Sequence, residues 1–194
     1  YTYRYDRKEV LDWDGFAGCW FAAALPYAYE LTGEKRYLEA AGKALDFYAG
    51  YVKALNCYGT PMDTWKSVDE EGNLAFIRVS RMMHQLTGEK KYLDYLELGA
   101  RYQYLWQYGF CAKPQYKPLK DSGWNSCGAS VTSVSNPHTH PMGALIIDDL
   151  EYLAEQTGSE YHRKRAEDAF AWLMNTMELY PDVSGYGEYG VMTE

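Results

Sequence analysis

The stretch that decides the fold is Leu31-Thr32-Gly33-Glu34-Lys35-Arg36-Tyr37-Leu38, because it recurs as Leu86-Thr87-Gly88-Glu89-Lys90-Lys91-Tyr92-Leu93. A weaker third copy reads Gln156-Thr157-Gly158-Ser159-Glu160-Tyr161. In each copy an apolar helical pattern precedes the glycine and another follows it. Glycine just past a helix end can adopt the left-handed conformation that closes the helix. The acidic residue after it suits the positive N-terminus of the next helix. Each copy therefore predicts a tight turn inside an α-helical hairpin.

The repeat predicts an all-α chain of three antiparallel helical hairpins, at about 10–55, 72–109 and 141–178. The segments before the turns (15–31, 72–86 and 141–156) are expected to be inner helices. Those after the turns (35–55, 90–109 and 160–178) are expected to be outer helices. The first inner segment is apolar on all sides, which is typical of a buried helix, whereas the outer segments are amphipathic. We therefore expect the inner helices to be the more buried ones, at least in a complete domain.

The composition and charge of the chain argue against nucleic-acid and membrane partners. The chain has 194 residues, 47% hydrophobic and 24% charged, with a formal net charge of −8. Because phosphate contacts need concentrated basic groups and no run of five basic residues occurs, we expect no nucleic-acid partner. No apolar stretch reaches the roughly 18 residues of a membrane span, so we expect no membrane partner. The start at Tyr1 predicts a removed leader, with a secreted or periplasmic protein, or an excised piece.

The connections between the predicted hairpins mark one end of the domain. The tight turns lie at one end of the helices, so antiparallel packing places the other connections at the opposite end. These are residues 1–14, 56–71, 110–140 and the tail 180–194, which are rich in Trp, Asp, Gly, Asn and His. Loops this long inside a compact domain are usually functional. We therefore expect the functional residues to lie on this rim.

The inner and outer segments with Leu-Thr-Gly-Glu-Lys-x-Tyr-Leu turns resemble the six-hairpin glycosidase superfamily over residues 10–178. The resemblance implies an (α/α)6 toroid that acts on oligosaccharides, often ones that contain uronic acids. The chain departs from that pattern because it holds three hairpins where the ring needs six. We expect a single toroid-type domain, 1–194, that is about half of a longer catalytic domain. The alternatives are an open solenoid or two self-associated copies that complete a toroid.

Two acidic segments supply the carboxyl groups that glycoside hydrolysis needs on either side of the bond. Asp14 follows Trp13 just before the first inner segment, and Asp69 leads into the second, after Asp63 and Trp65. A tryptophan beside a carboxylate suits a sugar site, because C–H faces pack on the indole while hydroxyls bond to the acid. We predict Asp14 and Asp69 as catalytic, and Trp13, Asp63 and Trp65 as substrate-binding. Ordinary helix capping by these acids is the structural alternative.

The densest polar cluster lies between residues 121 and 141. His138 and His140 stand in a proline-flanked loop before an inner segment and could orient a substrate carboxylate or share in proton transfer. We predict His138 as a third catalytic residue. Trp124, Asn136 and His140, with Tyr186 in the tail, are predicted to bind substrate.

A metal site formed by His138, His140 and Cys127 or Cys111 is the alternative for this loop. That spacing matches no standard zinc pattern, and no CxxC occurs among the four cysteines. Neither a phosphate-binding loop nor a dinucleotide fingerprint is present, so we predict no cofactor and no metal. Buried free thiols are the favoured interpretation of the cysteines.

The prediction for function is a glycoside hydrolase with a carbohydrate substrate. The same toroid also serves sugar epimerases or isomerases and polysaccharide lyases, so these stay open. A non-catalytic helical-repeat module that binds peptide or protein is the fourth possibility.

Overall fold

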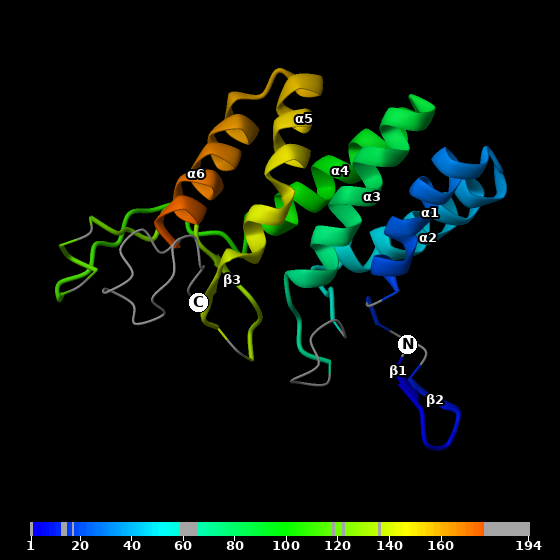
Figure 1. The fold of residues 1–194 in the computed structure, drawn as a ribbon, viewed down its shortest axis with the longest axis horizontal. Coiled ribbons are helices and arrows are strands. Elements are labelled where there is room, and N and C mark those ends of the chain that lie inside the picture. The colour runs from blue at the N-terminus through cyan, green and yellow to red at the C-terminus, as the bar shows by residue number, and fades with distance from the viewer. Residues whose placement is uncertain are drawn as a thin grey trace. The chain divides into compact units, whose positions relative to one another are not determined.

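The computed structural model describes residues 2–12, 15–16, 18–58, 66–117, 119–121, 123–135 and 137–176. Over these residues the chain is mainly helical, with four short strands, so the all-α prediction is confirmed (Figure 1). The chain divides into two compact units. The first unit comprises Tyr1–Gln103 with Thr132–Pro137, and the second comprises Tyr104–Val131 with His138–Glu194. Each unit is described by itself.

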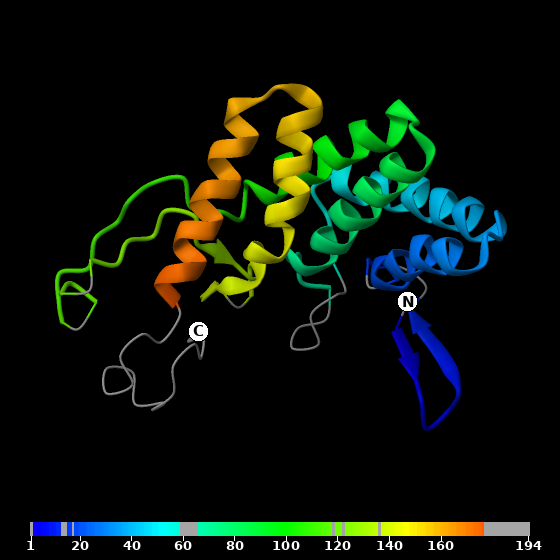
Figure 2. The same ribbon diagram turned by 45° about the horizontal axis from the view of Figure 1, so that its top comes forward.

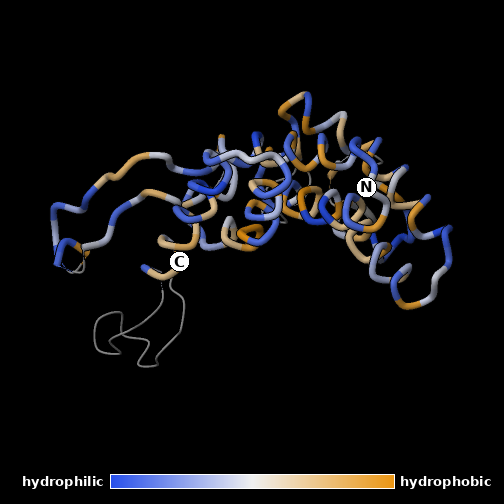
Figure 3. The backbone as a smooth tube through the Cα atoms, turned by 90° about the horizontal axis from the view of Figure 1, so that it is seen from above, coloured by the Kyte–Doolittle hydropathy of each residue, from blue (hydrophilic) through white to orange (hydrophobic). Residues whose placement is uncertain are grey.

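The first unit begins with the antiparallel strands β1 (Thr2–Arg4) and β2 (Glu9–Asp12), which the helical repeat did not predict. Four helices follow: α1 (Cys19–Thr32), α2 (Arg36–Lys53), α3 (Glu71–Thr87) and α4 (Lys90–Gln103). Helix α1 packs against α2 and α3, and α3 also packs against α2 and α4. Polar and apolar segments alternate along the helical backbone, as expected for amphipathic helices (Figure 3).

The repeated Thr-Gly pair closes three helices in the same way. Gly33, Gly88 and Gly158 adopt φ values of 71°, 69° and 66°, so the predicted left-handed caps are confirmed. The threonine before each glycine donates its hydroxyl to the carbonyl four residues earlier, at 2.7 Å in every copy. At Thr32 and Thr87 the same hydroxyl also accepts from the backbone N–H two residues later, at 3.2 Å. The threonine therefore stabilises both sides of the turn.

Helices α1 and α3 differ in how many of their side chains are buried, although both were predicted to be buried inner helices. Helix α3 buries most of its side chains, including Phe76, Ile77 and Met83 at 0% exposure. Helix α1 buries only Cys19, Ala22 and Pro26, while Phe21 is 78% exposed and Leu31 is 87% exposed. The expected burial of the first inner helix is therefore not found in this chain. The reason is that α1 packs against the described helices α2 and α3, whereas α3 packs against α1, α2 and α4.

The second unit holds strands β3 (Ser130–Val131) and β4 (Thr139–His140), the 3₁₀ helix η1 (Pro141–Ile146), α5 (Ile147–Thr157) and α6 (Glu160–Thr176). Helices α5 and α6 pack side by side and the chain reverses between them (Figure 2). The segment predicted as one inner helix over 141–156 starts as the 3₁₀ turn η1. The outer segment predicted over 90–109 stops at Gln103, because the backbone from Trp106 onward pairs with residues 126–131.

Within the described residues, no helix is long and apolar enough to cross a membrane.

Candidate functional site

Asp69 and Glu70 form a carboxyl pair at the start of α3. Asp69 Oδ1 accepts from the backbone N–H of Gly72 at 3.4 Å, so the side chain caps one of the amides at the helix N-terminus that have no partner within the helix. The negative charge also suits the positive end of the helix dipole. Asp69 is 1% exposed and Glu70 is 0% exposed. The structure thus places the predicted catalytic Asp69 in a buried capping position.

A buried amide network holds Glu70 in place. Gln103, the last residue of α4, donates its Nε2 to Glu70 Oε2. Asn73, one turn into α3, donates its Nδ2 to Gln103 Oε1 at 3.1 Å and to the carbonyl of Gly99 at 2.9 Å. Asn73 and Gln103 are themselves almost fully buried. Because unpaired buried polar groups are costly, these amides fix one arrangement of the α3 and α4 ends.

Three further segments converge on this helix start within the first unit. Asp69 donates its backbone N–H to the carbonyl of Cys57 at 3.0 Å, and Glu70 donates to the carbonyl of Thr132 at 3.0 Å. The Tyr102 hydroxyl donates to the Asp69 carbonyl at 3.4 Å. Asp69 also pairs with Ser133 in a β-bridge. The Asp69 backbone is therefore held by segments that are far apart in the sequence.

The surroundings of this cluster shift the pKa of the Cys57 thiol, which is fully buried. Burial is the main cause that raises the pKa of the Cys57 thiol to about 12. The negative charge of Asp69 acts in the same direction, while a hydrogen bond with Tyr102 opposes it. Cys57 is therefore a neutral thiol at physiological pH, and it is no candidate nucleophile.

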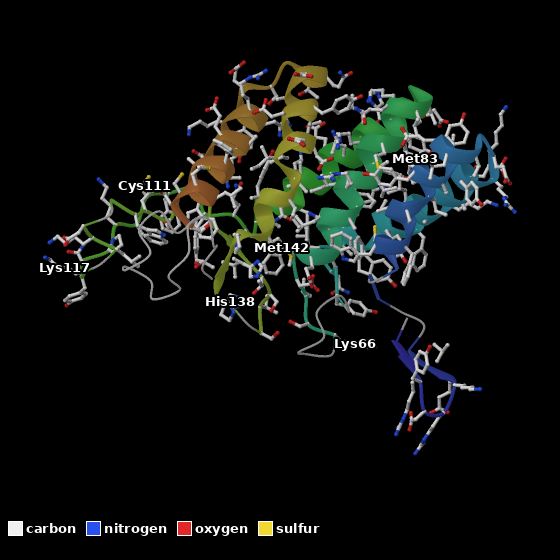
Figure 4. All side chains as sticks on the ribbon, in the orientation of Figure 1. Lys66, Met83, Cys111, Lys117, His138 and Met142 are labelled. Carbon is white, nitrogen blue, oxygen red and sulfur yellow. The ribbon has the colours of Figure 1, made fainter. Side chains whose placement is uncertain are left out.

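His138, which is labelled in Figure 4, lies beside His140 in the second unit, on the segment that leads into η1. Their ring centroids are 5.5 Å apart. His140 Nδ1 accepts from the backbone N–H of Met142 at 3.0 Å, so this side chain caps η1. The lone pair of Nδ1 is thereby occupied. His138 and His140 are both half-buried.

Ser130 fixes the shape of the histidine loop. Its hydroxyl donates to the carbonyl of His140 at 3.0 Å and accepts from the backbone N–H of Gly143 at 3.1 Å. Strands β3 and β4 pair in the same place, with Ser130 opposite His140. Hydrogen bonds within the loop therefore fix its shape. His140 caps η1, whereas His138 does not.

The predicted site residues fall into three groups. Asp69 belongs to the first unit, and His138, His140 and the half-buried Trp124 belong to the second. The structure brings Asp69 together with residues 132–135, and His138 together with His140. The remaining predicted residues lie outside the described part of the chain: Trp13, Asp14, Asp63, Trp65, Asn136 and Tyr186.

The metal alternative finds no support in the described part of the chain, where no three His, Cys, Asp or Glu side chains gather as ligands. The structure brings His138 beside His140 but not into a ligand set with Cys127 or Cys111.

Sequence reasoning missed the partners of the carboxyl pair. Glu70 stood next to Asp69 in the acidic segment, so its neighbourhood was visible but its complete burial was not. Asn73 and Gln103 carried no signal, because they are thirty residues apart and meet only when α3 packs on α4.

Comparison with known proteins yields no relative: no protein-family model matches the chain, and no curated protein matches it significantly.

Proposed function

We propose that the chain belongs to a carbohydrate-active enzyme, a glycoside hydrolase that acts on oligosaccharides by carboxylate acid/base chemistry. The observation that carries the proposal is the buried carboxyl pair Asp69 and Glu70 at the start of α3. Burying two neighbouring carboxyl groups is costly, and proteins that only need a helix cap can use an exposed Ser, Thr or Asp instead. Enzymes use buried carboxyl groups as general acids and bases.

The roles divide between the two carboxyls. Asp69 is proposed as the catalytic carboxyl group, with Asp14 as the second group that hydrolysis needs. Glu70 is proposed as a positioning residue, because Gln103 holds its carboxylate and its backbone N–H bonds to Thr132. His138 is proposed to contact an acidic group on the sugar, and Trp124 is proposed to pack on a sugar face.

The test is turnover of aryl glycosides and of neutral and uronic-acid oligosaccharides by the full chain. Asp69→Asn keeps the size of the side chain but removes its charge, so we expect turnover to fall at least about 100-fold. The matched control is Asp94→Asn, which changes an exposed carboxylate in α4 that pairs with Lys90. Circular dichroism establishes that both variants keep the wild-type helix content. Full turnover in Asp69→Asn would remove Asp69 from the catalytic set.

Product analysis separates the reaction classes. Hydrolysis gives one new reducing end for each bond cleaved and no ultraviolet-absorbing double bond. An unsaturated uronic product would identify a lyase, and an isomeric sugar of unchanged mass would identify an epimerase. Either product contradicts the hydrolase proposal, as does the absence of both binding and turnover across the panel.

The role of His138 is tested by affinity. If His138 contacts a sugar carboxylate, His138→Ala should weaken binding of a uronic-acid oligosaccharide more than that of its neutral counterpart. His84→Ala, near the C-terminal end of α3, is the control histidine. Equal losses for both sugars would contradict the carboxylate contact and leave the loop as scaffold.

A further inference from the structure

The base of the loop at residues 112–126 is a backbone ladder in the second unit. Trp106 and Tyr108 pair with the segment that ends at Val131, through hydrogen bonds of 2.8–2.9 Å. Further along, the backbone N–H of Ser126 donates to the carbonyl of Ala112 at 3.2 Å. Residues 106–108 and 112 on one segment therefore lie beside residues 128–131 and 126 on the other, and the register shifts by one residue between the Gln107–Ser130 bridge and the Ala112–Ser126 hydrogen bond. The two segments run antiparallel along this contact.

Cys111 and Cys127 lie on either side of the Ala112–Ser126 contact. Cys111 is one residue before Ala112, and Cys127 is one residue after Ser126, where the chain turns so that Ala129 donates to the Ser126 carbonyl at 3.0 Å. The Ser126 hydroxyl reinforces the pairing, because it accepts from the N–H of Ala112 at 2.9 Å and donates to the carbonyl of Phe110 at 2.7 Å. The two side chains are near enough to interact, since the neighbouring Cys111 is one of the causes that raise the pKa of the Cys127 thiol. Residues that flank a backbone contact between two antiparallel segments are close enough for a disulfide to form with a small local adjustment.

The four cysteines fall into two classes of accessibility. Cys19 and Cys57 in the first unit are fully buried, and burial raises the pKa of both thiols. Cys111 is exposed and is labelled in Figure 4, while Cys127 is half-buried. Only the second pair therefore combines mutual proximity with access to a dissolved reagent.

We propose that Cys111 and Cys127 are a redox site of this protein, which forms an intramolecular disulfide and closes the loop 112–126. The oxidant is a low-molecular-weight disulfide, for which oxidised glutathione serves as the probe. Nothing in the proposed carbohydrate chemistry requires this bond, so the inference stands apart from that proposal.

The reaction is two successive thiol–disulfide exchanges. The thiolate of exposed Cys111 attacks one sulfur of oxidised glutathione, forms a mixed disulfide and releases one glutathione thiolate. The thiolate of Cys127 then attacks the Cys111 sulfur, forms the Cys111–Cys127 bond and releases the second glutathione thiolate. The two thiol protons end on the two glutathione molecules, and two electrons pass from the protein to the oxidant.

Helix α6 holds Cys127 at the fixed end of this loop. Asp168 in α6, which pairs with Lys164, is near enough to the Cys127 thiol to raise its pKa. Gly128 lies directly against the same helix, since a Cβ at that position would be only 1.9 Å from the carbonyl oxygen of Asp168. The disulfide would therefore tie the exposed strand of the loop, at Cys111, to a residue that α6 already anchors. Trp124 lies within the closed loop.

The primary experiment is thiol mapping of the full chain with and without oxidised glutathione. Native alkylation of the reduced protein should label Cys111 and Cys127 and leave Cys19 and Cys57 unlabelled. After oxidation the chain should lose the mass of two hydrogen atoms, resist native alkylation and yield a Cys111–Cys127 peptide on non-reducing digestion. Retention of both reactive thiols at equilibrium, a bond that involves Cys19 or Cys57, or a dimer linked through Cys111 would each overturn the proposal.

Single serine variants give a second measurement that does not depend on isolating the disulfide. Cys127→Ser should retain glutathione on Cys111, because the resolving thiol is gone, whereas the wild type should release it. The oxidised wild type should melt at least about 5 °C above the reduced form, because the closed loop restricts the unfolded chain. Cys111→Ser and Cys127→Ser should show no such redox-dependent shift. A persistent glutathione adduct in the wild type would contradict ring closure.

The environment of Cys127 predicts the pH dependence of ring closure. Burial first, and then the negative charge of Asp168 and the neighbouring Cys111, raise the pKa of the Cys127 thiol. Lys164 faces the same carboxylate. Because the thiolate is the attacking form, the closure rate should rise about tenfold per pH unit below that pKa. Asp168→Asn should speed closure at pH 7, whereas Glu167→Gln on the exposed neighbour should not; a slower or unchanged rate in Asp168→Asn would contradict the role of Asp168.

Discussion

Helices α1 and α3 end in the same Thr-Gly turn, yet they meet different surroundings. Helix α3 packs against α1, α2 and α4, and it buries Phe76 and Ile77 completely. Helix α1 packs against α2 and α3 and leaves Trp20, Phe21 and Leu31 exposed. The more uniformly apolar sequence thus belongs to the less buried helix. Apolar composition shows what a helix can tolerate on each side, whereas its burial depends on which neighbours are present.

The largest expected effect comes from removing an aromatic ring from each helix. Phe76 in α3 is fully buried and packs against Phe16 and Tyr95, with ring centroids 6.3 and 5.9 Å away. Phe76→Ala should lower the free energy of unfolding by about 3–5 kcal/mol, because it leaves a cavity. Phe21→Ala in α1 should change it by no more than about 0.5 kcal/mol. Urea denaturation of both variants checks this, and equal losses would refute the difference in burial.

A smaller effect is expected from adding a methyl group where α4 meets α3. A Cβ on Gly99 would lie 2.7 Å from Ile77 Cγ1 and 3.1 Å from Phe76 Cδ1. Gly99→Ala should therefore destabilise the fold by about 1–3 kcal/mol through overpacking. Gly50→Ala in α2 is the matched control, since a Cβ there meets nothing within 4 Å. It should gain about 0.5–1 kcal/mol from helix propensity. A neutral Gly99→Ala variant would mean that the α3–α4 contact is loose.

The smallest difference between the two helices is expected at their caps. Gly33 and Gly88 both have positive φ, and a Cβ at either position meets nothing within 4 Å. Gly33→Ala and Gly88→Ala should each cost about 1–2 kcal/mol, because the left-handed conformation is strained for alanine. The two costs should be equal within about 0.5 kcal/mol despite the difference in helix burial. Thermal denaturation measures both, and a markedly larger loss at Gly88 would show that the cap is coupled to the core around α3.

Local features of the fold could be predicted from sequence, and long-range ones could not. The turns at Gly33, Gly88 and Gly158 follow from residues next to one another, so the helix pattern around them was predicted correctly. The end of α4 at Gln103 and the strand pairs depend on backbone partners that are distant in the chain, such as Tyr108 and Ala129. No local pattern encodes those partners, and the prediction extended the helix to 109.

In the candidate site, too, local features could be predicted from the sequence and long-range contacts could not. The position of Asp69 at a helix start was readable from the acidic segment before an apolar one. Its burial was not, because that depends on Tyr102 from α4 and Ser133 from a distant loop. His140 was predicted to bind substrate, and the structure adds a capping bond to Met142 that only the η1 geometry reveals. The proximity of Cys111 to Cys127 likewise depends on the contact between Ala112 and Ser126, which are distant in the chain.

The segment Thr132–Pro137 belongs to the first unit, although the chain on both sides of it belongs to the second. Thr132 accepts from the backbone N–H of Glu70, and Val134 donates to the carbonyl of Val68. The first unit is therefore discontinuous in sequence, and no single cut of the gene separates the two units intact. A truncation after Gln103 would leave Val68 and Glu70 without these backbone partners, next to the carboxyl pair. Any attempt to express the first unit alone needs a splice that returns residues 132–137 to it, for example through a short glycine linker.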